Sequence, residues 1–167
     1  MIKGLRVVDL STEIAGPYCT KLLADAGADV VKVETGEGDP LRSWTASGAK
    51  LGDDVGALFR FLNTSKRSVM GGLGDGAVDE LVAGADVVVE SSPQGVDVGA
   101  LHGANAGLTV LSISPFGRRG PWSERPATEF TLQAWCGSTG GRGVPDGPPL
   151  YAGGRLGEWV GGAYAAV

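Results

Sequence analysis

The stretch from residue 5 to residue 34 most constrains the fold of this chain. Leu5–Leu10 is an apolar run of the kind found in strands, and the Leu/Ala-rich segment Pro17–Ala26 has a proline in its first turn and a glycine directly after its end. A second, Val-rich run, Asp29–Glu34, follows at once. A strand, a helix and a strand in this order predict a crossover between parallel strands, and such folds bind ligands in the loops beyond the strand ends.

The same alternation continues along the chain. Helices are predicted at Ala77–Ala83 and Val98–Ala104, and strands at Asp86–Glu90 and Leu108–Ser114. These strands are apolar without strict alternation, which is typical of strands covered on both faces. We therefore predict an α/β fold built on a parallel sheet.

Two segments do not follow this alternation. Thr35–Gly76 is rich in Gly and Asp, and we expect a long irregular segment, which usually has a function or packs against a partner. Trp159–Val167 resembles the beginning of a helix, so the chain is expected to stop inside a structural element. Because this helix and the edge of a half-complete sheet would both need partners, we do not expect a stable monomer.

Composition excludes several classes of protein. With 167 residues, of which 43% are hydrophobic, the chain is expected to form one domain with a core of ordinary size. The net charge of -5 argues against a nucleic-acid-binding protein, which needs clustered Lys and Arg. No apolar run reaches the ~18 residues of a membrane span, and the N-terminus has no signal pattern. We therefore expect a cytoplasmic protein that does not contact a membrane.

Cysteine and histidine are too few and too scattered for a metal site or a histidine-based triad. Cys19 and Cys136 are far apart and are expected to be reduced thiols. The single histidine, His102, falls on a predicted helix and is expected at the surface. The sequence therefore predicts no metal and disfavours hydrolysis by a triad.

Several blocks along the chain, taken in order, resemble one enzyme family. The blocks are Gly4–Leu10, Ala15–Pro17, Leu22–Glu34, Gly38–Arg42, Lys66–Val69, Ala85–Glu90, Ser112–Gly117 and Pro145–Pro149. Their order resembles that of the class III CoA-transferases, which include formyl-CoA transferase, the carnitine CoA-transferases and α-methylacyl-CoA racemase. Any single block is weak, but the ordered set makes a specific match.

The resemblance implies the architecture and the partners. Residues 1–167 would be the N-terminal part of a Rossmann-like large domain, and the family's small domain and returning C-terminal segment would lie outside this chain. The family forms an interlocked homodimer, so we expect a homo-oligomer or a homologous partner chain. The substrates would be an acyl-CoA and a carboxylic acid that accepts the CoA, without a metal.

The resemblance also implies two catalytic carboxylates. The family uses an Asp as a covalent nucleophile, and Glu158 stands at that position with one more methylene. A second acid, Glu129, matches a residue that assists at the active site. In the racemases a histidine precedes this second acid, whereas this chain has Thr128, which is not a base near neutral pH. Racemisation is therefore disfavoured.

The positions that would bind CoA have partly changed. The residues implied by the resemblance are Ile14, Ala15, Arg42, Lys66, Arg67, Ser91 and Ser92. Ser91 and Ser92 replace an Asn and an aromatic residue, and glycines stand where basic residues are expected, around Gly74 and Gly99. Three functions stay open: a CoA-transferase with a glutamate nucleophile, a catalytically silent or regulatory half of such an enzyme, and an acyl-CoA racemase.

Overall fold

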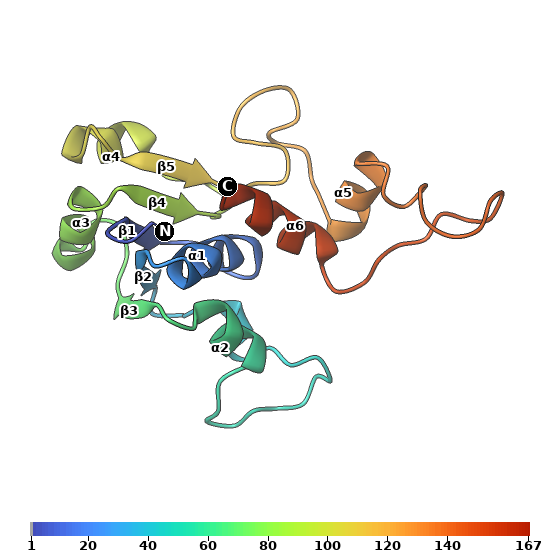
Figure 1. The fold of residues 1–167 in the computed structure, drawn as a ribbon, viewed down its shortest axis with the longest axis horizontal. Helices are drawn as coiled ribbons and strands as arrows, with labels where there is room; N and C mark the ends of the chain where they lie inside the picture. The colour runs from blue at the N-terminus through green and yellow to red at the C-terminus, as the bar shows by residue number, and fades with distance from the viewer. Residues whose placement is uncertain (1) are drawn as a thin grey trace.

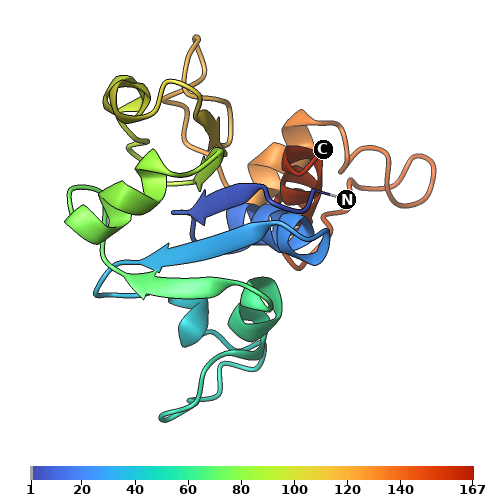
Figure 2. The same cartoon turned by 60° about the vertical axis from the view of Figure 1, so that its left-hand side comes forward.

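The computed structural model describes residues 2–167, and its centre is a five-stranded parallel sheet with the order β3-β2-β1-β4-β5 (Figures 1 and 2). The strands are β1 (Arg6–Asp9), β2 (Asp29–Glu34), β3 (Arg67–Met70), β4 (Val87–Glu90) and β5 (Thr109–Ser112). The strand order reverses at β1, which pairs with β2 on one side and with β4 on the other. The predicted parallel α/β fold is confirmed, and ligand sites in such sheets lie outside the carboxyl ends of the strands at a reversal of this kind.

Helices pack on both faces of the sheet (Figure 1). They are α1 (Ala15–Asp25), α2 (Ala57–Asn63), α3 (Gly76–Ala83), α4 (Val98–Ala104), α5 (Glu129–Trp135) and α6 (Leu156–Ala165), with a short 3-10 helix η1 (Pro40–Arg42). α3 and α4 cover one face, whereas α1 and the end of α6 pack on the other. α5 contacts α6 and stands away from the sheet.

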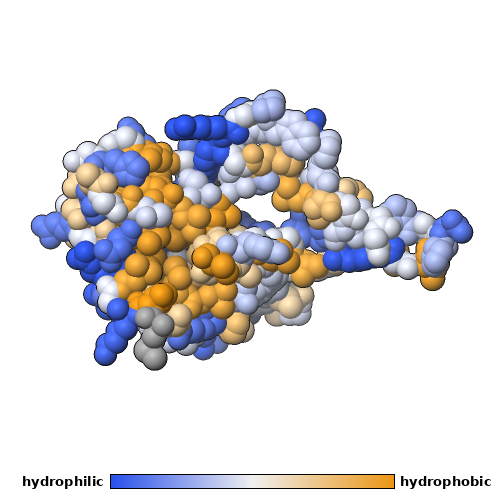
Figure 3. Space-filling view, turned by 45° about the horizontal axis from the view of Figure 1, so that its top comes forward, coloured by the Kyte–Doolittle hydropathy of each residue, from blue (hydrophilic) through white to orange (hydrophobic). Residues whose placement is uncertain are grey.

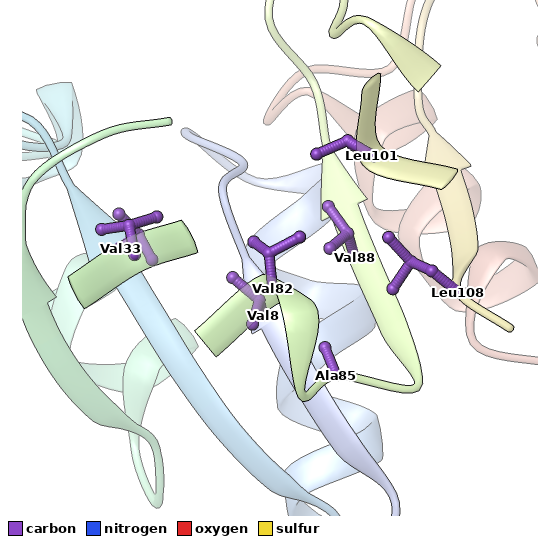
Figure 4. Packing of buried hydrophobic residues seen from close by; sticks show 8 residues of the cluster. Val8, Val33, Val82, Ala85, Val88, Leu101 and Leu108 are labelled. Carbon is purple, nitrogen blue, oxygen red and sulfur yellow. The ribbon is translucent and has the colours of Figure 1, made fainter. Parts of the chain in front are cut away.

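The core consists of one apolar cluster on each face of the sheet. Val7 and Val8 belong to opposite clusters, and so do Val88 and Val89, because successive side chains of a strand point to opposite faces. Figure 4 shows the cluster beneath α3, where Val82 packs against the strands. β1, β2 and β4 are therefore buried on both faces, as their composition predicts, whereas the edge strand β5 stays partly or fully exposed.

The expectation of an irregular Thr35–Gly76 segment is wrong, because this segment contains η1, α2 and β3. β3 pairs only with β2 and forms an edge of the sheet, so its residues stay partly or fully exposed and form no apolar run. α2 spans only seven residues, of which Phe59 and Leu62 are buried. Helix α5 was likewise not predicted, although its capping box, Thr128 with Thr131, marks its start.

The expectations for the thiols and the histidine are confirmed. Both cysteines are free, Cys19 buried and Cys136 exposed. Burial raises the pKa of Cys19 to about 11, and the Asp9 carboxylate adds to this effect, so this thiol is not a nucleophile near neutral pH. His102 lies exposed on α4.

Asp9, the last residue of β1, has a fully buried carboxylate. Its Oδ1 accepts hydrogen bonds from the N–H and the hydroxyl of Ser11, and its Oδ2 accepts from Thr20 Oγ1 at 2.6 Å and from Lys66 Nζ at 3.0 Å. Lys32 Nζ lies 3.9 Å from Oδ1. Burial raises the pKa of Asp9, but the two lysines and the hydroxyl donors outweigh burial and hold the pKa below its ordinary value.

The two lysines that face Asp9 are also buried and have further partners. Lys66 Nζ donates to the Pro17 carbonyl oxygen and to Asn63 Oδ1, each at 2.9 Å. Lys32 Nζ lies 3.4 Å from Asp39 Oδ2. This network ties the loop after β1, α1, β2 and the residues before β3 to one point at the carboxyl end of β1.

Helix α6 crosses α1 at very short range. A Cβ atom at Gly162 would overlap the carbonyl oxygen of Ala15, whereas one at Gly161 would meet open space. Trp159 packs edge-on against Tyr18 of α1 with ring centroids 4.9 Å apart. The missing side chain at Gly162 therefore sets the distance between the two helices.

Replacing Gly162 with alanine should separate α6 from α1. We expect Gly162→Ala to lower the free energy of unfolding by ~1–3 kcal/mol, as overpacking does, measured by urea unfolding followed by circular dichroism. Gly161→Ala is the matched control and should leave stability unchanged or raise it, because alanine favours helices over glycine. Equal stabilities for the Gly162 variant and the wild type would contradict this role.

Replacing Asp9 with asparagine should leave two buried ammonium groups without their shared counter-charge. We expect Asp9→Asn to lower the free energy of unfolding at pH 7 by ~3–5 kcal/mol, measured by urea unfolding. The pKa of Asp9 is lowered in the folded protein, so its contribution is present above the unfolded pKa of ~3.9 and is lost as pH falls through the folded pKa.

The difference in free energy of unfolding between the wild type and the Asp9→Asn variant should therefore become smaller at acidic pH. The control is Asp54→Asn, which removes an exposed carboxylate from the surface ion pair with Arg60 and should change stability little. If the difference in free energy of unfolding stays constant from pH 7 down to pH ~3, the charge of Asp9 is not the cause of the lost stability.

Candidate active site

Segments that are distant in the sequence meet at the carboxyl ends of β1 and β4. In the loop after β1, the N–H of Thr12 donates a 3.1 Å hydrogen bond to the loop after β4. The next residue, Glu13, forms an ion pair with Arg155, which directly precedes α6. The N–H of Gly157 in α6 donates to Glu129 Oε1 of α5 at 2.6 Å. The loops at the reversal of strand order therefore join the N-terminus of α6.

Glu158 lies in the first turn of α6, at the point where these segments meet. Its side chain is 26% exposed, and its Oε1 accepts a 2.5 Å hydrogen bond from Arg155 Nε. The positive end of the helix dipole stabilises an anion in this turn. The carboxylate is thus oriented by Arg155 and partly accessible, which are properties that a carboxylate nucleophile needs.

Glu129 lies beside the residue that precedes Glu158. Its Oε1 accepts hydrogen bonds from the Gly157 N–H and from Gln133 Nε2, the latter at 2.7 Å. Its Oε2 is buried and has no hydrogen-bond partner within residues 2–167. The structure therefore bonds Glu129 to the backbone of the residue next to Glu158 and leaves one buried oxygen of Glu129 free to accept a bond.

Gln133 is a buried residue of this region that the sequence analysis missed. Its Nε2 donates to the Ala152 carbonyl oxygen at 2.8 Å, and its Oε1 accepts from the Ala152 N–H and from Arg142 Nη1, each at 3.0 Å. The side chain thus fixes the segment that returns to α6 and orients Glu129. A glutamine on a short helix gives no sequence signal for such a role.

Ile14 and Ala15 lie at the junction of the loop after β1 and α1. Ile14 is 2% exposed and packs with Leu41, Phe59 and Leu62. Ala15 is partly exposed, and its carbonyl oxygen faces Gly162 of α6. The structure therefore places these two residues next to the helix that carries Glu158.

Arg42 of η1 is held by Glu34, the last residue of β2. Its Nε and Nη2 donate to the two carboxylate oxygens at 2.6 and 2.8 Å, and these bonds hold the pKa of Glu34 below its ordinary value. The Arg42 side chain is 41% exposed and lines an open hollow with Trp44 and Lys50. The guanidinium of Arg42 is thus oriented by Glu34 and remains accessible to solvent.

The other two predicted basic residues are placed differently. Lys66 is 1% exposed and its ammonium lies in the Asp9 network. Arg67 forms a bidentate pair with Asp29, the first residue of β2, so its exposed side chain lies toward the amino edge of the sheet. The structure therefore does not bring Arg67 together with Glu158.

Ser91 and Ser92 follow β4 at the carboxyl edge. Ser91 Oγ accepts the bond from the Thr12 N–H, so it lies beside the loop that contains Glu13. Ser92 donates its N–H to Glu90 Oε2 at 2.9 Å, and its carbonyl oxygen accepts from Arg118 at 2.5 Å. Both serines therefore shape the edge to which the loop after β1 is tied.

Two more features concern metals and membranes. Within residues 2–167, no group of three or more His, Cys, Asp or Glu side chains could hold a metal ion. No helix in the same part of the chain is long and apolar enough to cross a membrane.

Comparison with known proteins shows which family the chain resembles. The sequence model of CoA-transferase family III matches residues 2–167. The chain is 34% identical to the succinate–glutarate CoA-transferase of Agrobacterium fabrum, over 98% of this chain and 44% of that protein. It is 40% identical to the succinyl-CoA:mesaconate CoA-transferase of Haloarcula marismortui, over 99% of this chain and 45% of that protein.

A solved structure shows the same fold. The CaiB/BaiF family protein of Brucella suis superimposes with a TM-score of 0.86 at 34% identity, over 98% of this chain and 46% of that one. The chain thus spans less than half the length of these relatives. Because the family model matches residues 2–167, the chain belongs to CoA-transferase family III.

Proposed function

We propose that this chain acts in a CoA-transferase that moves CoA from an acyl-CoA to a carboxylic acid, with Glu158 as the covalent carboxylate. The observation that carries the proposal is the place of Glu158 in the first turn of α6, partly exposed and held by Arg155, at the carboxyl edge of the sheet. Family membership supports the substrate class, because the relatives are named as CoA-transferases.

A carboxylate suits this reaction because it is both nucleophile and leaving group. An oxygen of Glu158 bonds to the thioester carbonyl carbon, the C–S bond breaks, and CoA leaves as a thiolate. The thiolate then attacks the Glu158 carbonyl carbon of the mixed anhydride and releases the acyl group as a free carboxylate. The acceptor acid reverses these two steps and leaves as its CoA thioester, so no proton is transferred overall.

Glu129 and the loop after β1 would assist this carboxylate. Glu129 holds the Gly157 N–H, and so fixes the backbone beside Glu158. Arg42, Ser91 and Ser92 all follow the carboxyl ends of strands, where CoA would approach Glu158. We propose these residues, with Ile14 and Ala15, as the CoA-binding side of the site.

The site is proposed to be completed by an assembly. The small domain and the returning segment of the family would come from outside this chain, and the partner would be a second copy or a homologous chain. Exposed apolar residues support such contacts: on α6, Val160 is 46% and Tyr164 is 80% exposed. Figure 3 shows that apolar residues form a broad area on the body of the molecule.

The central test traps the intermediate on Glu158. The assembly that contains this chain is incubated with acyl-CoA and treated with hydroxylamine or borohydride, and the modified residue is identified by mass spectrometry. We expect modification of Glu158, because an anhydride or thioester is far more electrophilic than a carboxylate. Glu158→Gln should abolish trapping, and Glu158→Asp should retain it with the family's shorter side chain.

The results for the control and for Glu158→Gln distinguish the alternative functions. Glu124→Gln is the control, since it changes an exposed carboxylate elsewhere in the chain and should leave trapping unchanged. Activity that survives Glu158→Gln would place the working carboxylate elsewhere, with Glu129 or a partner chain next in order. No CoA binding and no trapping in the complete assembly would instead favour a catalytically silent half.

CoA binding is tested at Arg42. We expect Arg42→Ala to weaken acyl-CoA binding by ~1.5–3 kcal/mol, the scale of a hydrogen bond to a charged group, in calorimetry on the assembly. Arg42→Lys keeps the charge beside Glu34 and should lose less. Arg6→Ala is the control, because it removes an arginine of a surface ion pair at the amino edge and should not change binding. Equal affinities for the Arg42→Ala variant and the wild type would remove Arg42 from the site.

A further inference from the structure

Two residues beside Glu158 have a backbone conformation that side chains rarely adopt. Arg155 has φ 57° and ψ 43°, and Glu13 has φ 66°. Left-handed backbone favours glycine, and non-glycine residues in this region are held there by their surroundings and cluster at functional sites. These two residues are 142 positions apart in the sequence and pair with each other through their side chains.

The pairing forms a chain of three charges that ends at Glu158. Arg155 Nη2 pairs with Glu13 Oε2, while Arg155 Nε donates to Glu158 Oε1 at 2.5 Å. The side chains of Arg155, Glu13 and Glu158 are 35%, 42% and 26% exposed. One guanidinium thus joins the loop after β1 to the first turn of α6 and touches the proposed nucleophile.

We propose that Arg155 is a positioning residue that aims Glu158, and that Glu13 holds the Arg155 guanidinium in place. This inference rests on the proposed function. When an oxygen of Glu158 displaces the CoA thiolate, the negative charge leaves the Glu158 side chain with the thiolate. Arg155 then loses one of its two carboxylate partners, and Glu13 keeps the partly buried guanidinium paired.

The backbone supports this role for the side chain of Arg155. Glycine would fit the left-handed conformation of residue 155 without strain, and two glycines, Gly153 and Gly154, precede it. The conformation places the guanidinium between a residue of the loop after β1 and a residue of α6. Both carboxylates are then fixed by planar donors, which a lysine cannot reproduce.

The test measures how fast Glu158 forms its covalent adduct. Arg155→Asn removes the guanidinium but suits both the left-handed backbone and the position before a helix, so the fold should be kept. In single-turnover assays on the complete assembly, we expect Arg155→Asn to slow adduct formation by roughly a hundredfold, the scale for a misplacement of about 1 Å. KM for acyl-CoA should change far less, because Arg155 is proposed to aim Glu158 and not to bind CoA.

Two further variants test whether Arg155 orients Glu158 or only stabilises the fold. Glu13→Gln should slow adduct formation less than Arg155→Asn, since the guanidinium remains but is less firmly held. Arg155→Lys should recover part of the rate, because the charge beside Glu158 returns. The control, Arg6→Ala, breaks an exposed ion pair at the amino edge of the sheet and should leave the rate unchanged. An unchanged rate in Arg155→Asn would overturn the proposal.

A stability measurement separates this inference from the proposed function. We expect Glu13→Gln to lower the thermal midpoint of the wild type but not that of the Arg155→Asn variant, because the two residues act through one contact. If the wild type forms no adduct, the proposed function fails. The coupling between the two variants then still tests whether Glu13 holds Arg155. If Glu13→Gln shifts the thermal midpoint equally in the wild type and in the Arg155→Asn variant, Glu13 does not hold Arg155.

Discussion

The buried carboxylate of Asp9 is the interaction on which the carboxyl edge of the sheet depends. A buried anion is tolerated only with hydrogen bonds and counter-charges. Asp9 obtains them from Ser11 in the loop after β1, from Thr20 in α1 and from Lys66 before β3. These segments must therefore converge on the end of β1. The loop that leaves this point contains Glu13, so the same network that closes the fold also sets the direction from which the site is approached.

The position of Glu158 follows from helix packing rather than from a loop. Because Gly162 has no side chain, α6 lies directly on the start of α1, and its first turn then reaches the loop after β1. Glu129 fixes the same turn from the other side through the Gly157 N–H. A carboxylate carried by a rigid helix end keeps its geometry, as the proposed role of Glu158 requires.

The sequence predicts the part of this structure that burial dictates. The unit Leu5–Glu34 and the later apolar strands follow from composition, because strands buried on both faces must be apolar. β3 and α2 were missed, since an edge strand and a seven-residue helix bury too little to leave a pattern. The proposed roles of Glu129 and Glu158 come from family resemblance. The contact between Glu13 and Arg155 is invisible in the sequence, because it depends on left-handed backbone at two distant positions.

Charge pairing within the chain bears on how CoA can be held. Arg42 is paired with Glu34, Lys66 with Asp9, Arg67 with Asp29 and Arg118 with Glu90. A phosphate that approaches these cations must compete with a carboxylate already in place, and the net charge of -5 opposes an anion from a distance. Arg42 is the best placed of the four, because it is half exposed and its pairing with Glu34 orients it. We therefore expect the remaining positive charge for CoA to come from the rest of the assembly.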